Sequence, residues 1–130
     1  MARPTRGMNA ARWANRIRLE TMPRVCMMLD LKDDLELIAE YKRYHQRVWP
    51  EVLQSLRDAG ILDMEIYLGG NRLFMILETV EGFSFAAKLK MDAANPKVQE
   101  WEELMWKYQQ ALPGTRPGEK WLPTEIVFKL

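Results

Sequence analysis

The segment EYKRYHQRVWPEV, residues 40–52, contains the only histidine of this 130-residue chain, His45. The pKa of an imidazole ordinarily lies near neutrality, so histidine can donate or accept a proton under physiological conditions. Tyr41 precedes His45 by four residues, which places both side chains on one face of a helix. The pair predicts proton-transfer chemistry in a pocket between helix and sheet, although a core histidine bonded to a backbone carbonyl fits the same pattern.

Indole rings beside a carboxylate form a second candidate set. Trp49 and Trp101 are two of the five tryptophans. An indole can stack on the apolar C–H face of a sugar, or it can serve only in core and dimer-interface packing. Glu102 follows Trp101, and its carboxylate either accepts hydrogen bonds from ligand hydroxyls or faces solvent. An indole and a carboxylate side by side favour a sugar over an aromatic ligand.

Other chemistries have little support in the sequence. His45 and Cys26 lie far apart and show no spacing typical of metal ligands, so we expect no metal site. The turn LGGNR is expected to close a hairpin rather than to open a helix, which excludes a nucleotide-binding loop. Ser55 and Ser84 lack the sequence context of a nucleophile elbow. We therefore expect no cofactor.

The charge distribution separates the ends of the chain. Residues 1–22 hold five arginines and one acidic residue, whereas residues 23–130 are mildly acidic. A mildly acidic domain is not expected to bind nucleic acid, and no apolar run is long enough to span a bilayer. The single cysteine excludes an intrachain disulfide and fits a reducing compartment such as the cytoplasm. We expect a flexible basic extension over residues 1–22 and a single domain over residues 23–130.

The hydrophobic periodicity predicts the order β-α-β-β-α-β. Alternating apolar residues predict strands over 24–31, in both arms of a hairpin within 63–80, and over 124–130. Helical spacing predicts a helix over 33–59 with a break at Trp49–Pro50, a short helix over 83–93 and a longer one over 95–112.

This order is typical of the ferredoxin-like split arrangement, an α+β fold with an antiparallel sheet and helices on one face. Both faces of the expected sheet are apolar, because Leu73 and Met75 alternate with Phe74 and Ile76. A second sheet from another copy of the chain is the simplest cover for the free face. We therefore expect a homodimer of the dimeric α/β-barrel type.

Several segments resemble the L-rhamnose mutarotase family. YKRYHQRVWPE (41–51) resembles the family segment Y-x-x-x-H-x-x-x-W-P-E. GILDMEIYL and NRLFMILE resemble its central hairpin, and VQEWEELM resembles its second long helix, so the resemblance covers about residues 24–130. It implies a dimeric enzyme that interconverts the α and β anomers of a 6-deoxy sugar without a cofactor. It also implies that His45 is the proton donor, that Tyr41 contacts the sugar and that Trp101 lines the pocket.

Two positions differ from the rhamnose-specific members of this family. Those members carry a tyrosine at the place of Met64 and a second tryptophan at the place of Glu102, and both positions would line the pocket. A site that pairs a particular hydroxyl rejects its epimer, because a buried polar group would lose its partner. The segments MEIY and GNRLFM resemble the branch associated with L-fucose. We therefore expect L-fucose as substrate and L-rhamnose as the second choice.

The expected fold also hosts other activities. The alternative within enzymes is a cofactor-free oxygenase or cyclase of the dimeric α/β-barrel type. The alternative outside enzymes is a sugar-binding dimer without catalysis, which would bind a sugar but have no particular need for His45.

Overall fold

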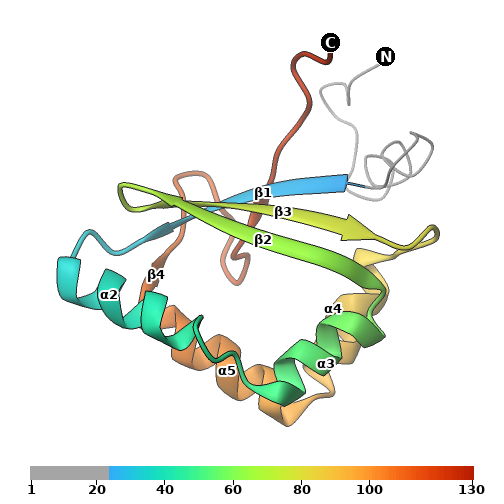
Figure 1. The fold of residues 1–130 in the computed structure, drawn as a ribbon, viewed down its shortest axis with the longest axis horizontal. Coiled ribbons are helices and arrows are strands. Elements are labelled where there is room, and N and C mark those ends of the chain that lie inside the picture. Colours follow the sequence, from blue (N-terminus) through green and yellow to red (C-terminus); the bar gives the residue numbers. More distant parts are fainter. Residues whose placement is uncertain (1–23) are drawn as a thin grey trace.

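A computed structural model describes residues 24–130, which form an antiparallel sheet with all its helices on one face (Figure 1). The strands are β1 (Arg24–Leu31), β2 (Ile61–Gly69), β3 (Arg72–Thr79), β4 (Gln109–Gln110) and β5 (Leu122–Pro123). The helices are α2 (Leu35–Tyr44), α3 (Pro50–Asp58), α4 (Phe85–Ala93) and α5 (Pro96–Trp106). The expected α+β fold class is confirmed, and the expected extension over residues 1–22 lies outside the described residues.

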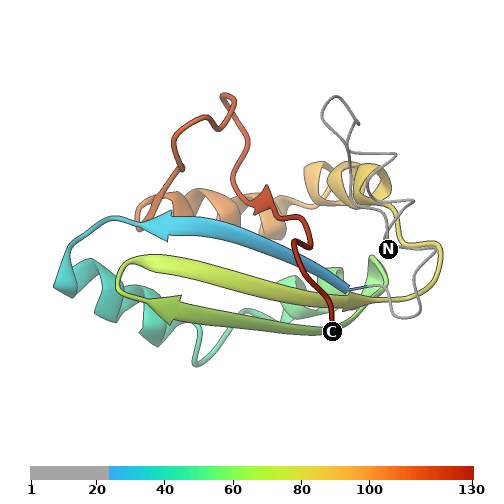
Figure 2. The same ribbon diagram turned by 90° about the horizontal axis from the view of Figure 1, so that it is seen from above.

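The sheet has the strand order β2-β3-β1-β4, and β5 pairs with β1 beside β4. Seen from above, α2 and α3 follow one another along the β2 side, while α5 and α4 follow one another along the β1 side (Figure 2). Two rows of paired residues face the helices, namely Val25–Leu77–Met64 and Met27–Met75–Ile66. The alternation of apolar residues along the strands therefore selects the face that the helices cover.

The break predicted in the first helical region is present. Helix α2 ends at Tyr44 and α3 begins at Pro50, because proline has no amide hydrogen to donate within a helix but fits its first turn. The N-cap of α2 is Asp34, whose carboxylate accepts a 3.0 Å hydrogen bond from the amide of Leu37. His45 consequently lies at the C-terminal end of α2 rather than inside a long helix.

The longer helix ends earlier than predicted. Helix α5 stops at Trp106, and Gln109–Gln110 pair with β1 as strand β4 instead of continuing the helix to residue 112. The amide of Lys32 donates a 2.8 Å hydrogen bond to the carbonyl oxygen of Tyr108, which draws this segment to the sheet edge. Tertiary hydrogen bonding thus overrides the helical periodicity of residues 107–112.

The strand predicted over residues 124–130 is wrong. The pairing with β1 is made instead by β5, and the last hydrogen bonds to β1 come from Thr124, whose amide and hydroxyl donate to the carbonyl oxygen of Cys26 at 3.0 Å and 2.8 Å. Beyond Thr124 the chain runs away from the sheet on the side opposite the helices (Figure 1). A strand needs a neighbour for its backbone groups, and the single chain offers this segment none.

The core between sheet and helices consists of two clusters. The first joins α2, α3, α5 and one end of the sheet through Leu31, Tyr41, Val52, Leu73, Trp101, Met105 and Tyr108. The second contains Val25, Ile61, Met75 and Leu77 near the other end. Ile66 and Trp121 pack against both clusters.

Candidate active site

His45 is held by the end of the helix that carries it. Its Nδ1 lies 2.8 Å from the carbonyl oxygen of Tyr41, one helical turn earlier. A carbonyl oxygen only accepts hydrogen bonds, so Nδ1 carries the hydrogen and donates it. In the neutral imidazole the other nitrogen, Nε2, then has a free lone pair and is the atom that can take up a proton.

Aromatic rings surround the imidazole. The ring centroid of His45 lies 4.2 Å from that of Tyr41 and 5.6 Å from that of Trp101. The ring of Trp49 lies 5.1 Å from that of Trp101, and the two rings meet edge to face. The structure therefore brings together four of the predicted site residues from α2, the segment 45–49 and α5.

Burial shifts the pKa values of both titrating groups in this cluster. It lowers the pKa of His45 below the usual value, and the hydrogen bond to the Tyr41 carbonyl opposes this effect only in part. The pKa of Tyr41 is raised to about 12, first by burial and then by the nearby charge of Glu102, against a hydrogen bond with Gln109. At neutral pH the site thus holds a neutral imidazole and a protonated phenol.

Glu102 forms an ion pair at the edge of this cluster. Its Oε2 lies 2.6 Å from Nζ of Lys120, a residue of the loop before β5. The Glu102 side chain is half-exposed, whereas only 11% of the Lys120 side chain is exposed. The influence of Glu102 on the pKa of Tyr41 places the carboxylate in the electrostatic surroundings of that hydroxyl. Glu102 thus directly follows Trp101 on α5, and its carboxylate is already bound to a cation.

Met64 is the predicted residue that the structure does not bring to this cluster. It lies on the helix-facing side of β2, opposite Leu77, and packs with the second core cluster. Ile66, two residues further along β2, packs against the cluster that contains Tyr41 and Trp101. In the single chain, Ile66 is therefore a side chain of β2 that packs against this arrangement, whereas Met64 is not.

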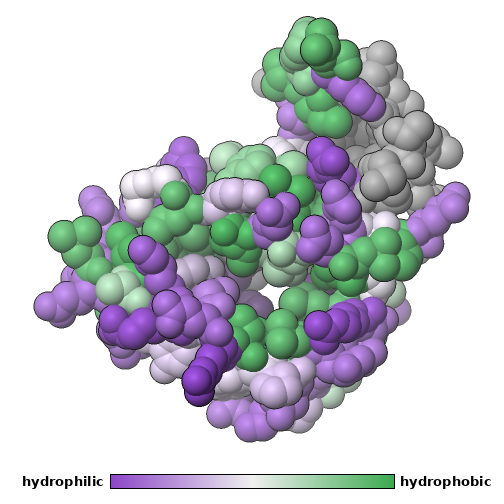
Figure 3. Space-filling model, viewed as in Figure 1, coloured by the Kyte–Doolittle hydropathy of each residue, from purple (hydrophilic) through white to green (hydrophobic). Residues whose placement is uncertain are grey.

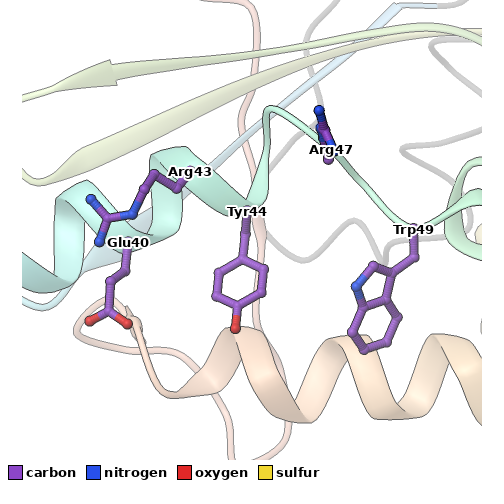
Figure 4. A pocket seen from close by; sticks show the side chains of 5 residues that line it. All are labelled: Glu40, Arg43, Tyr44, Arg47 and Trp49. Atoms are coloured by element: carbon purple, nitrogen blue, oxygen red, sulfur yellow. The ribbon is translucent and has the colours of Figure 1, made fainter.

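Two hollows adjoin the segment that carries His45. The face seen in Figure 3 is hollowed between β2 and the segment joining α2 to α3, and apolar side chains border the opening. A second hollow of about 380 Å³ is lined by Glu40, Arg43, Tyr44, Arg47 and Trp49. Figure 4 shows Tyr44 and Trp49 directed from this segment toward α5, with Arg47 directed away from it. Trp49 thus lines this second hollow and also contacts the ring of Trp101.

Three residues of this region were missed in the sequence, and a fourth, Trp121, is one of the tryptophans considered there for packing or for stacking on a sugar. Tyr44 contacts the Trp101 ring edge to face at 6.2 Å between centroids, and Trp121 packs between the two core clusters. Gln109 is buried, and its Oε1 accepts no hydrogen bond from the described residues. Lys120 holds Glu102. A tryptophan beside a lysine in a Pro- and Gly-rich loop was the only sequence signal for any of them.

Within the described part of the chain, no group of three or more His, Cys, Asp or Glu side chains is arranged to hold a metal ion. Over the same residues, no helix has the length and apolar character needed to cross a membrane.

The sequence matches a known protein family over all of the described residues. Residues 24–130 match the family described as L-rhamnose mutarotase. The chain is 49% identical over 112 residues to an L-fucose mutarotase of Xanthomonas campestris pv. campestris, which covers 85% of this chain and 90% of that protein. It is 31% identical over 96 residues to an L-rhamnose mutarotase of Enterococcus faecalis, covering 71% of this chain and 85% of that protein.

A solved structure has the same fold. The crystal structure of an L-rhamnose mutarotase from Formosa agariphila matches with a TM-score of 0.60 and 26% sequence identity. The match covers 82% of this chain and 97% of the other. The sheet with its one-sided helical layer is therefore the architecture of that enzyme as well.

Proposed function

The chain belongs to the L-rhamnose mutarotase family and is an isomerase acting on sugar anomers, and we propose that its substrate is L-fucose and that His45 carries the proton. The observation that supports the proton-transfer role is the hydrogen bond of His45 Nδ1 to the Tyr41 carbonyl, which leaves Nε2 available. Because burial lowers the pKa of His45, the neutral form that can accept a proton prevails at neutral pH.

Ring opening of the sugar moves one proton from the anomeric hydroxyl to the ring oxygen while the bond between the anomeric carbon and the ring oxygen breaks. Nε2 of His45 accepts the hydroxyl proton, and the imidazolium then donates a proton to the ring oxygen, so the imidazole ends unchanged. The resulting aldehyde group rotates about its carbon–carbon bond. The reverse steps close the ring on the other face and give the second anomer.

The surrounding side chains suit a sugar ring. Trp101 and Trp49 offer apolar indole surface for the C–H face of the ring, and Trp101 also contacts the His45 imidazole. Tyr41 is 4% exposed, so it acts mainly by holding His45 through its ring and its carbonyl oxygen. From β2 the site is bordered by Ile66, because Met64 packs with the second core cluster.

L-Fucose and L-rhamnose differ in the orientation of the hydroxyls on carbons 2 and 4, so a selective site must recognise a particular hydroxyl pattern. Glu102 provides a carboxylate that can accept hydrogen bonds from such hydroxyls. The 49% identical relative named as an L-fucose mutarotase also supports L-fucose, whereas the L-rhamnose mutarotase of Enterococcus faecalis is 31% identical.

A homodimer is part of the proposal, because the free face of the sheet remains apolar. Tyr67, Phe74 and Met28 lie in one row across β2, β3 and β1 on the face away from the helices. Phe74 is 37% exposed and Tyr67 is 53% exposed. The C-terminal segment beyond Thr124 adds exposed apolar side chains, which gather at that end of the molecule in Figure 3. A second copy of the chain would cover both surfaces.

Saturation-difference NMR with L-fucose, L-rhamnose and D-glucose tests the substrate assignment, because it measures exchange between anomers at equilibrium. Above the rate in buffer, exchange is expected to be fastest for L-fucose, slower for L-rhamnose and not accelerated for D-glucose. Faster exchange of L-rhamnose than of L-fucose at equal concentrations would overturn the assignment to L-fucose.

A further inference from the structure

The ion pair of Glu102 with Lys120 joins the helix that carries Trp101 to the loop that precedes β5. Lys120 Nζ lies 2.6 Å from Glu102 Oε2 and 3.3 Å from the backbone oxygen of Glu102. It also lies 4.7 Å from the centroid of the Trp106 ring, on the next turn of α5. All three contacts join the ammonium group of Lys120, in the loop, to residues of α5.

The pair fixes one oxygen of the carboxylate and leaves the other without a hydrogen-bond partner among the described residues. Oε2 of Glu102 takes the hydrogen bond from Lys120, and no described side chain donates to Oε1. The Lys120 side chain is largely buried, whereas 45% of the Glu102 side chain is exposed. A charge-assisted hydrogen bond from a buried ammonium therefore orients a carboxylate that a ligand can still reach.

This carboxylate lies among other polar atoms of the site. Its charge contributes to the raised pKa of Tyr41, which also hydrogen bonds with Gln109. Gln109 is 5% exposed, and its Oε1 has no hydrogen-bond partner among the described residues. A buried acceptor without a partner is costly, so this oxygen is a destabilising feature next to the aromatic rings of the core. Glu102 and Gln109 thus both influence the pKa of Tyr41, and Lys120 orients the first of them.

We propose that Lys120 is a positioning residue for the sugar site, because it anchors the loop before β5 to α5 and fixes the Glu102 carboxylate so that its free oxygen selects the hydroxyl pattern of the sugar. This inference rests on the proposed mutarotase function. It assigns the preference for one 6-deoxy sugar to the Lys120–Glu102 pair rather than to Glu102 alone. Glu102 contacts the sugar, and Lys120 acts through Glu102.

The test compares Lys120→Met, Glu102→Gln and Lys120→Arg by anomer-exchange kinetics with L-fucose and L-rhamnose. Lys120→Met removes the charge but retains a side chain of similar length. The ratio of kcat/KM for L-fucose to kcat/KM for L-rhamnose is therefore expected to fall about tenfold, mainly because KM for L-fucose rises. Glu102→Gln should lower the same ratio. Lys120→Arg keeps the cation and should restore most of the ratio.

Lys88→Met is the matched control, because Lys88 forms a half-buried pair with Asp92 within α4, outside the site. It should leave the ratio of the two sugars unchanged. The swapped variant Glu102→Lys with Lys120→Glu separates anchoring from recognition. It should recover the thermal stability lost in Lys120→Met, but not the sugar preference, because an ammonium then stands where the carboxylate stood.

The outcomes separate this inference from the proposed function. If the wild-type protein accelerates anomer exchange for no sugar, the proposed function fails. If the wild type is active, but Lys120→Met and Glu102→Gln keep the wild-type ratio of the two sugars, the positioning role of Lys120 is overturned. An equal loss for both sugars in Lys120→Met, recovered by the swapped variant, would also overturn it, because that pattern indicates loop anchoring alone.

Discussion

The Nδ1 atom of His45 lies 2.8 Å from the carbonyl oxygen of Tyr41, at the point where helix α2 ends. The same carbonyl oxygen also accepts a 3.3 Å hydrogen bond from the backbone amide of His45, so the backbone and the side chain of His45 both bind it. The same bond fixes the ring and its tautomer, which leaves Nε2 as the nitrogen for proton transfer. The C-cap residue of α2 is thereby also held in the orientation and tautomer that proton transfer requires.

The pH dependence of the reaction follows from the lowered pKa of His45. If neutral Nε2 accepts the first proton, kcat/KM is low when the imidazole is protonated, rises as the pH rises, and reaches a plateau. The midpoint of this limb is expected below 6.5, the ordinary pKa of the group. Anomer exchange measured from pH 4.5 to 8, with the buffer rate subtracted, checks this. If kcat/KM instead falls as the pH rises through this range, the protonated imidazolium acts first.

Substitution of Trp101 should affect catalysis more than a comparable change elsewhere. Trp101→Phe removes part of the indole that contacts His45 and Trp49, so kcat/KM for L-fucose is expected to fall about tenfold through misplacement of the imidazole and loss of stacking. Phe85→Leu is the control, because it disrupts an aromatic contact with Phe83 away from the site. Equal activity of Trp101→Phe and wild type would contradict the assigned contact.

Gly60, between α3 and β2, is predicted to resist substitution. Its φ is +95°, and an added Cβ would lie 2.7 Å from Cγ2 of Val80. Gly82 has a similar φ of +85° with open space around it. Gly82→Ala should cost about 1 kcal/mol of unfolding free energy for its backbone conformation, and Gly60→Ala should cost more because of the added clash. Urea unfolding of the two variants measures the difference, and an equal cost would contradict the close approach.

The proposed dimer can be tested through Phe74, which lies on the free face of the sheet between Met28 and Tyr67. Light scattering coupled to size-exclusion chromatography should give the wild type twice the chain mass of 15.3 kDa. Phe74→Asp should shift the protein to the monomer, because it puts a charge into the apolar face. Leu89→Asp, at an exposed site on α4, should remain dimeric. A monomeric wild type would refute the dimer.

The sequence was sufficient for the central elements of the fold. Alternation along Leu73, Met75 and Leu77 correctly predicted that these side chains of β3 share one face, and all three are buried. Pro50 marked the break between α2 and α3. The four-residue spacing of Tyr41 and His45 likewise predicted that they share a face, and their rings do contact.

The other parts of the fold and of the site depend on contacts between residues far apart in the sequence, which local sequence patterns do not reveal. Residues 107–112 continue the helical spacing, yet Gln109–Gln110 pair with β1, more than 75 residues earlier in the chain. The strand predicted over residues 124–130 has no neighbour within the single chain. Lys120 meets Glu102 only because the loop before β5 returns to α5, and the sequence separation of 18 residues gives no sign of that approach.

The exchange rate between the anomers of L-fucose, measured by saturation-difference NMR for wild type and His45→Gln, tests the central claim most directly. His45→Gln is expected to lose at least about 100-fold in catalysed exchange, since it retains a polar side chain but cannot carry the proton. Gln46→Ala, at the exposed neighbouring position, should exchange as fast as wild type. Rapid exchange in a folded His45→Gln protein would contradict the account, because the imidazole would then not be the proton carrier.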